Sequence, residues 1–312
     1  MEDEQMKKMI CSILMLMGVL FGSVQYNVAL AAESSETMDA KERLINIYQD
    51  FSAEQTALEM DIDIDTMLGK ARLHTNMIGT NTTPFVGKAE NSITFALLGQ
   101  KSTEFQSTQY IEQVGDALRV YTFSDKKWVK QTIPNFKDIS VENNLREQMN
   151  FVKSITIQGE TEEAVDVTIV YDFDKVGEAI EKNLAEDKSI FKTAEEKQSF
   201  ITGCKNVMHY IGEVPYTQHI DKKNKVITAE LDVSDTIKKA AEGIMNEIPE
   251  MKELDKARVN QFLKDMTVKM QMECRAIDGG EKIKIPEEAI KQAKEIKFDT
   301  AKEKIDKEAT KK

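Results

Sequence analysis

Apolar and acidic side chains alternate strictly over residues 58–65, where leucine, methionine and isoleucine are separated by glutamate and aspartate. Successive side chains of a β-strand point to opposite faces, so this pattern predicts a strand with one apolar and one charged face. The same alternation returns between Met266 and Cys274, with polar residues at the intervening positions. Strands of this kind build antiparallel sheets that are covered on one side. The functional question is therefore whether a protein core or a hydrophobic ligand covers the apolar side.

Shorter patterns predict further strands along most of the chain. Gly115-Asp116 separates two alternating segments and is typical of a two-residue hairpin turn. In the first half, strands are predicted at 71–78, 91–98, 109–114, 117–123 and 128–133. In the second half, they are predicted at 152–157, 165–173, 216–220, 226–233 and 283–285.

Helical periodicity occurs before and between these strands. Leu44, Ile47, Tyr48 and Phe51 fall on one face of a helix predicted over 38–52. Further helices are predicted at about 174–184, 193–209, 234–245 and 286–296, and a charged segment up to Asn260 is compatible with one more. The order of elements has no strict βαβ alternation, which predicts an α+β fold with a large antiparallel sheet.

The N-terminal segment has the pattern of a signal peptide. Lys7 and Lys8 precede an apolar stretch, and Ala29-Leu30-Ala31 has the small-x-small form of a cleavage site. The apolar stretch is shorter than the about 20 residues of a typical membrane span, although a retained anchor stays an alternative. Cys11 lacks the small preceding residue of a lipobox, which argues against lipidation. We expect a signal peptide over 1–31 and a secreted, extracytoplasmic protein with no lipid tether.

The remaining chain is long enough for one sizeable core. We expect one α+β domain over 32–300 and a charged, disordered tail over 301–312. The whole chain has a formal net charge of −12, and removal of the predicted leader would leave −11. An acidic chain does not suit nucleic acid or unaided binding to an anionic membrane surface. The charge is also what keeps many secreted proteins soluble.

Two cysteines follow the predicted leader, Cys204 and Cys274, and both lie on predicted apolar faces. In an oxidising compartment such a pair can form a disulfide, which would staple the fold locally. Two buried free thiols are the alternative, and the sequence does not decide between them.

No pattern of catalytic or cofactor-binding residues stands out. The three histidines, His74, His209 and His219, have no neighbouring carboxylate and hydroxyl in the sequence that would indicate a nucleophilic site. The run from Asp61 to Asp65 imitates the start of a calcium loop, but threonine and arginine occupy the positions that need glycine and glutamate. We therefore predict no catalytic residue, no metal site and no cofactor, and we expect a non-enzymatic protein.

Methionine is frequent on the predicted strand faces. It is flexible and polarizable, and it suits surfaces that accept varied apolar partners, although it also fills irregular cores. If a ligand lies against the two alternating strands, the residues that face it are Met60, Ile62, Ile64, Met266, Val268, Met270 and Met272.

Several segments resemble the LolA/LppX-like lipoprotein-carrier superfamily. They are the hairpin Tyr110–Tyr121 and the strand Lys127–Lys130, following a leader and an N-terminal helix. Tyr216–Lys223 and Ile283–Ala289 are similar to a family of secreted lipoproteins of Gram-positive bacteria with that fold. The resemblance covers roughly residues 38–298 and carries no catalytic motif. It implies an open half-barrel sheet wrapped around helices, with an apolar cavity for lipid chains. Those relatives usually carry a lipobox cysteine, which this chain lacks.

Two hypotheses follow for the function. The first is a monomeric protein of the cell envelope that binds a hydrophobic ligand, such as an acyl chain, lipid or lipopeptide, in the half-barrel. The alternative is a structural or interaction module whose sheet is filled by its own helices and whose surface binds an envelope protein. A hydrolase would require the three histidines and acidic residues to come together in the fold.

Overall fold

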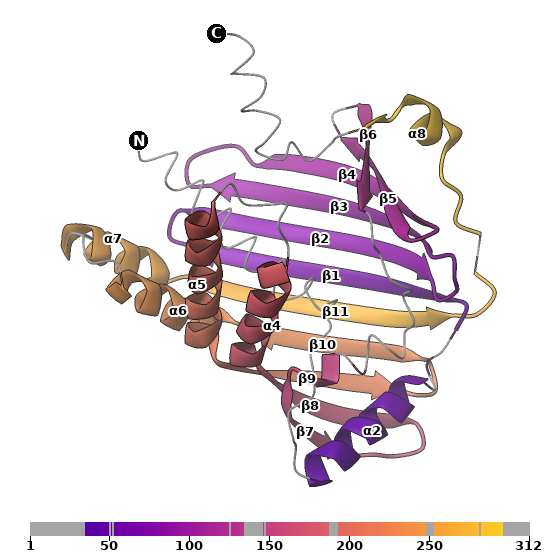
Figure 1. Cartoon of the computed structure of the whole chain (residues 1–312), viewed down its shortest axis with the longest axis horizontal. Coiled ribbons are helices and arrows are strands. Elements are labelled where there is room, and N and C mark those ends of the chain that lie inside the picture. The colour runs from indigo at the N-terminus through magenta and orange to yellow at the C-terminus, as the bar shows by residue number, and fades with distance from the viewer. Residues whose placement is uncertain are drawn as a thin grey trace.

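The computed structural model describes residues 35–49, 51, 53–124, 126–133, 146, 148–186, 193–247, 253–280 and 282–295. The predicted signal peptide and the predicted C-terminal tail lie outside these residues. The described strands form one sheet of 12 strands with β12 at one edge and β7 at the other. Figure 1 shows the β7 edge beside the N-terminal helix α2 (Ser35–Gln49). The sheet is therefore open, and the large antiparallel sheet expected from the sequence is present.

The sheet joins a meander to a second antiparallel group. The meander comprises β1 (Gln55–Thr66), β2 (Gly69–Thr80), β3 (Val86–Leu97), β4 (Thr103–Val114), β5 (Ala117–Ser124) and β6 (Lys127–Ile133). The second group comprises β7 (Val152–Gln158), β8 (Ala164–Asp172), β9 (Glu213–Asp221), β10 (Val226–Asp232) and β11 (Thr267–Ile277). The two strands with the clearest alternation, β1 and β11, pair along almost their full length at the junction. This pairing makes the two groups one sheet.

The turn predicted at Gly115-Asp116 connects β4 and β5. Gly115 has a φ of 61°, in the left-handed region that glycine enters without a steric penalty. The structure extends β4 back to Thr103, through a polar stretch whose sequence does not alternate. Pairing with β3 makes this stretch a strand, because its own sequence pattern does not predict one.

The C-terminal elements differ from the prediction. Residues 283–285 are not a strand, and α8 (Glu287–Gln292) ends earlier than the helix predicted to about 296. Extended backbone at Ala293, with φ −63° and ψ 121°, ends the helix. The chain then forms the short strand β12 (Lys294–Glu295) in parallel beside β6. Main-chain pairing at this sheet edge overrides the local helical pattern.

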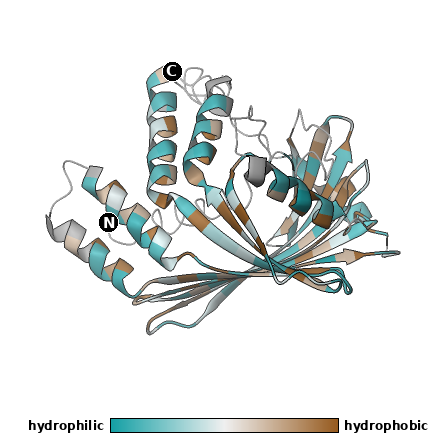
Figure 2. Cartoon of the chain, turned by 90° about the horizontal axis from the view of Figure 1, so that it is seen from below, coloured by the Kyte–Doolittle hydropathy of each residue, from teal (hydrophilic) through white to brown (hydrophobic). Residues whose placement is uncertain are grey.

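The remaining helices lie on one face of the bent sheet (Figure 2). They are α2 (Ser35–Gln49), α4 (Phe173–Glu186), α5 (Ala194–Ile211), α6 (Ser234–Glu247) and α7 (Glu253–Lys264). Each is amphipathic, as α2 illustrates: Leu44 and Ile45 are buried, whereas Glu42 and Arg43 are exposed. We call the side of the sheet that bears Ile62 the helix-covered face, and the other side the opposite face. None of the described helices combines the length and apolar character needed to cross a bilayer.

The main core lies between these helices and one part of the sheet. It contains buried residues of all five helices and of strands β1 and β8–β11, together with Val152 of β7. Of the strands β2–β6, only Leu73 packs against this cluster. The core therefore fills the β7–β11 side of the helix-covered face, and β1 marks its border.

Candidate functional site

A row of apolar side chains crosses six strands on the helix-covered face. The antiparallel register places each member directly opposite the next, and paired residues point to the same face. Five strand spacings give the row a length of about 24 Å. We call it the cross-sheet row; from β10 to β4 it consists of Leu231, Met270, Ile62, Leu73, Ile93 and Phe105.

Exposure rises along the cross-sheet row. Leu231 is 9% exposed, and Met270 and Ile62 are each 3% exposed, because helices cover them. Leu73 and Ile93 are half-buried, and Phe105 at the far end is 57% exposed. One apolar surface thus begins in the protein core and continues onto a part of the sheet that the described helices leave uncovered.

Aromatic packing organises the exposed end of this row. Phe105 meets Phe95 of the neighbouring strand edge to face, with ring centroids 6.3 Å apart. Leu97, two residues beyond Phe95 on the same face, is 38% exposed. A contiguous patch of exposed large apolar side chains is a frequent mark of a ligand-binding or partner-binding surface.

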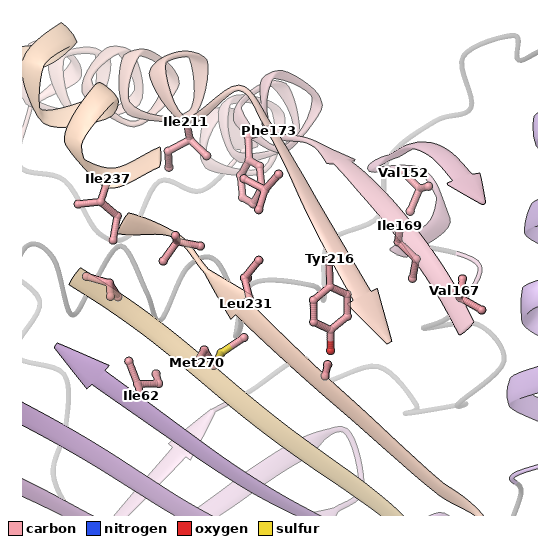
Figure 3. Close-up of a cluster of buried hydrophobic side chains, with 14 of the residues drawn as sticks. Ile62, Val152, Val167, Ile169, Phe173, Ile211, Tyr216, Leu231, Ile237 and Met270 are labelled. Carbon is pink, nitrogen blue, oxygen red and sulfur yellow. The ribbon is translucent and has the colours of Figure 1, made fainter. Parts of the chain in front are cut away.

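The residues predicted to face a ligand all lie on the helix-covered face, but they divide into two groups. Ile62, Met266, Val268 and Met270 are 0–3% exposed and belong to the core. Figure 3 shows Ile62 and Met270 within this cluster. Met60, Ile64 and Met272 are only partly buried and pack against the edge of that core. The first group belongs to the core beneath the protein's own helices, and the second group lies at the edge of that core.

A cluster of tyrosines and one glutamine lies in the core between α2 and strands β8 and β9. The hydroxyl of Tyr48 donates a hydrogen bond to Oε1 of Gln218, and Tyr171 and Tyr216 have ring centroids 6.4 Å apart. Burial raises the pKa of Tyr48 and of Tyr171 well above the usual value of 10, and that of Tyr216 to about 12. These phenols therefore stay neutral at physiological pH and are structural residues of the core.

Cys204 lies on α5 and Cys274 on β11, and both are free thiols in the structure. Burial raises the pKa of Cys204, and it raises that of Cys274 to about 11. Thiolates are the reactive form of cysteine, so both side chains have the character of inert, partly buried thiols.

The three histidines belong to separate elements, β2, α5 and β9. Each has its own aspartate partner: His74 with Asp61 at 3.1 Å, His209 with Asp174 at 3.0 Å, and His219 with Asp166 at 2.7 Å. In the strand order, β2 and β9 are four spacings apart, about 19 Å. This arrangement does not bring the histidines together as the hydrolase hypothesis requires.

The opposite face carries the acids of the alternating strand β1. Asp61 accepts hydrogen bonds from Nε and Nη2 of Arg72 at 3.1 and 2.9 Å, and Lys70 pairs with Asp65. One carboxylate oxygen of Glu59, one of Asp61 and a ring nitrogen of His74 all lie within 4.8 Å of one another. The two faces of the same strand thus have different chemistry, one apolar and one rich in carboxylates.

The exposed end of the cross-sheet row was not predicted from the sequence pattern. Ile93 lies on a predicted strand face, but Phe105 lies in the polar stretch that was not predicted as a strand. The pairing of Ile93 with Phe105 depends on the register between β3 and β4, which follows from a loop of five residues. An isolated phenylalanine among polar residues was the available signal.

Taken together, the fold and this face define a large open antiparallel sheet with an apolar, partly uncovered surface. No protein-family model matches the chain, and no curated protein matches it. The chain is similar to the crystal structure of LprF from Mycobacterium bovis, with 10% identity, a TM-score of 0.31, and coverage of 82% of this chain and 99% of LprF. It is also similar to a DUF1329 family protein from Desulfovibrio piger, with 8% identity, a TM-score of 0.24, and coverage of 80% and 96%.

At these TM-scores, neither likeness carries an argument about the fold or function of this chain. The resemblance to the LolA/LppX-like carriers stays a prediction from the sequence.

Proposed function

We propose that this protein is a non-enzymatic binding protein of the cell envelope, which holds a hydrophobic ligand on the helix-covered face of its sheet. The ligand is an acyl chain, a lipid or a lipopeptide. One observation carries the proposal: the cross-sheet row continues from the core onto uncovered strands and ends at Phe105, which is 57% exposed. The assignment to the envelope rests on the predicted leader and on the sequence resemblance.

The ligand would lie beside the core rather than inside it. The helices already fill the space against Met270 and Ile62, so the uncovered part between Leu73 and Phe105 offers the apolar contact. Met60 and Ile64, partly buried on β1, would line the border between ligand and core. Each Å² of apolar surface removed from water contributes about 25 cal/mol, so a long hydrocarbon chain gains affinity without specific polar contacts.

The test is a titration of the purified, delipidated protein with an environment-sensitive fluorescent fatty acid. We expect saturable binding that is lost in Phe105→Glu and in Ile93→Glu, because each substitution places a charge on the proposed contact surface. Gln106→Glu is the matched control, since Gln106 is the next residue of β4, is exposed, and points to the opposite face.

Two results would contradict the proposal. One is absence of binding by the delipidated wild type, and the other is equal binding by Phe105→Glu and Gln106→Glu. Native mass spectrometry of protein purified without delipidation provides a second readout. A lipid adduct is expected, whereas a clean apo mass together with no binding would favour an interaction module with a self-filled core.

A further inference from the structure

The alternation of β1 places Glu59 and Asp61 two residues apart on the opposite face of the sheet. The register between β1 and β2 places His74 directly opposite Asp61. From this juxtaposition we propose that Glu59, Asp61 and His74 form a binding site for a divalent transition-metal ion of the Zn²⁺ type. The site lies on the other face from the cross-sheet row, so it is independent of the proposed lipid function.

The spacing of the three ligand atoms suits such an ion. Tetrahedral coordination with bonds of about 2.0–2.1 Å places neighbouring ligand atoms about 3.3 Å apart. Nδ1 of His74 and Oδ1 of Asp61 are already 3.1 Å apart, and all three ligand atoms lie within 4.8 Å of one another. To reach this spacing, the most distant ligand atoms must approach each other by about 1–2 Å. Glu59 is exposed, so its long side chain has room for this movement.

The kinds of donor indicate the class of metal. An imidazole nitrogen with two carboxylates suits Zn²⁺ and neighbouring transition metals, whereas Ca²⁺ and Mg²⁺ prefer oxygen ligands alone. Asp61 has 17% and His74 37% of its side chain exposed, so the site is open on one side to water or a fourth ligand.

The surrounding charges also favour a cation. Glu59 lies directly opposite Glu273 of β11, and like charges at paired positions of antiparallel strands repel each other. Arg275 already pairs with Glu273 at 2.5 Å, so a bound divalent ion would chiefly offset the charges of Glu59 and Asp61. The competing cation is Arg72, which donates two hydrogen bonds to Oδ1 of Asp61.

Arg72 has a second carboxylate within reach. Its Nε is 3.7 Å from Oδ1 of Asp63, on the same face of β1. A metal ion can therefore displace Arg72 from Asp61 while Arg72 keeps an ionic partner. This competition predicts that removing the guanidinium strengthens metal binding, which is a result that a purely structural ion pair would not give.

The chain contains a matched control for the histidine. His219 faces Asp166 across β9 and β8 in the same cross-strand geometry, with Nδ1 and Oδ1 2.7 Å apart. Among the described residues, no third ligand atom lies within 4.8 Å of the His219–Asp166 pair. The His74–Asp61 pair differs, because Glu59 supplies such an atom. His219→Asn therefore removes an equivalent pair without touching the proposed site.

The experiment is a Zn²⁺ titration of the full chain, made without a histidine tag, in competition with a chromophoric chelator. We expect one ion per chain, about tenfold or more weaker binding in His74→Asn and Glu59→Gln, and unchanged binding in His219→Asn. Arg72→Met is expected to bind more tightly than the wild type. Circular dichroism of each variant shows whether it is folded.

Thermal unfolding is the second readout, because an ion that binds only the folded chain raises the midpoint temperature. Zn²⁺ should raise it for the wild type and His219→Asn, but not for His74→Asn. Absence of a stoichiometric ion, or equal affinity of the wild type and His74→Asn, would overturn the proposal. If His74→Asn does not fold, Arg72→Met retains all three ligands, and failure of that variant to bind more tightly would overturn it too.

Discussion

At the scale of single residues, the two cysteines provide a direct test of the core. In a Cys11→Ser variant unfolded without reductant, a thiol reagent should count two thiols per chain, those of Cys204 and Cys274. In the native protein at pH 8, Cys274 should react about a hundredfold more slowly than an exposed thiol, because burial raises its pKa to about 11. A count of zero thiols would instead establish the disulfide that the sequence left open.

Single side chains also show which parts of the site the sequence could predict. The alternation over 58–65 was sufficient to place Ile62 on an apolar face and Asp61 on a charged one. The partner of Asp61 was not predictable in the same way, since His74 lies 13 residues away. Their contact depends on the turn at Met67–Leu68, because a shift of one residue in register would send His74 to the other face.

At the scale of elements, Ser234 connects the start of α6 to β11 through a hydrogen bond. Its hydroxyl oxygen accepts a hydrogen bond from the backbone N–H of Val268 at 2.8 Å, and its hydroxyl donates to Asp232. Ser234→Ala leaves the N–H of the buried Val268 without this acceptor, so we expect a loss of about 1–3 kcal/mol in the free energy of unfolding. Urea denaturation measures the loss, and Ser154→Ala, at an exposed position of β7, is the control.

The loss of stability in Ser234→Ala should depend on pH, because the hydroxyl of Ser234 donates its hydrogen bond to the titratable side chain of Asp232. The hydrogen bond from Ser234 holds the pKa of Asp232 below its ordinary value of 3.8. A lowered pKa in the folded state contributes stability above the unfolded pKa of about 3.9, and that contribution disappears as the pH falls through the folded value. The difference between wild type and Ser234→Ala should therefore narrow below about pH 4. A difference that widens in acid would contradict this role.

Elements with strong alternation or amphipathic periodicity were predictable because their own residues determine them. The strand β11 and the helix α5 were expected close to their observed positions, at Thr267–Ile277 and Ala194–Ile211. The first half of β4 and the edge strand β12 were not, because their partners in the sheet determine them. Local patterns therefore identified most strands, including the edge strand β7, but they did not identify the segments that only pairing with a neighbour makes extended.

At the scale of the whole molecule, helices cover one part of a continuous sheet and leave another part with less support. The buried cluster lies over β1 and β7–β11, whereas β3–β5 contribute no residue to it. Few buried apolar contacts mean a smaller free energy of local opening, even where backbone hydrogen bonds are complete. The same asymmetry that leaves room for a ligand should therefore be visible as uneven local stability.

Native-state hydrogen exchange tests this relation. We expect the amides of β8–β11 to exchange most slowly and those of β3–β5 to exchange faster, through local opening of the uncovered part. A bound fatty acid should slow exchange in β3 and β4 selectively, because it supplies the missing apolar contact against Ile93 and Phe105. The ligand effect should vanish in Phe105→Glu and persist in Gln106→Glu. Uniform protection across the sheet would mean that the exposed end of the cross-sheet row is as stable as the core, and the link between incomplete cover and ligand binding would be lost.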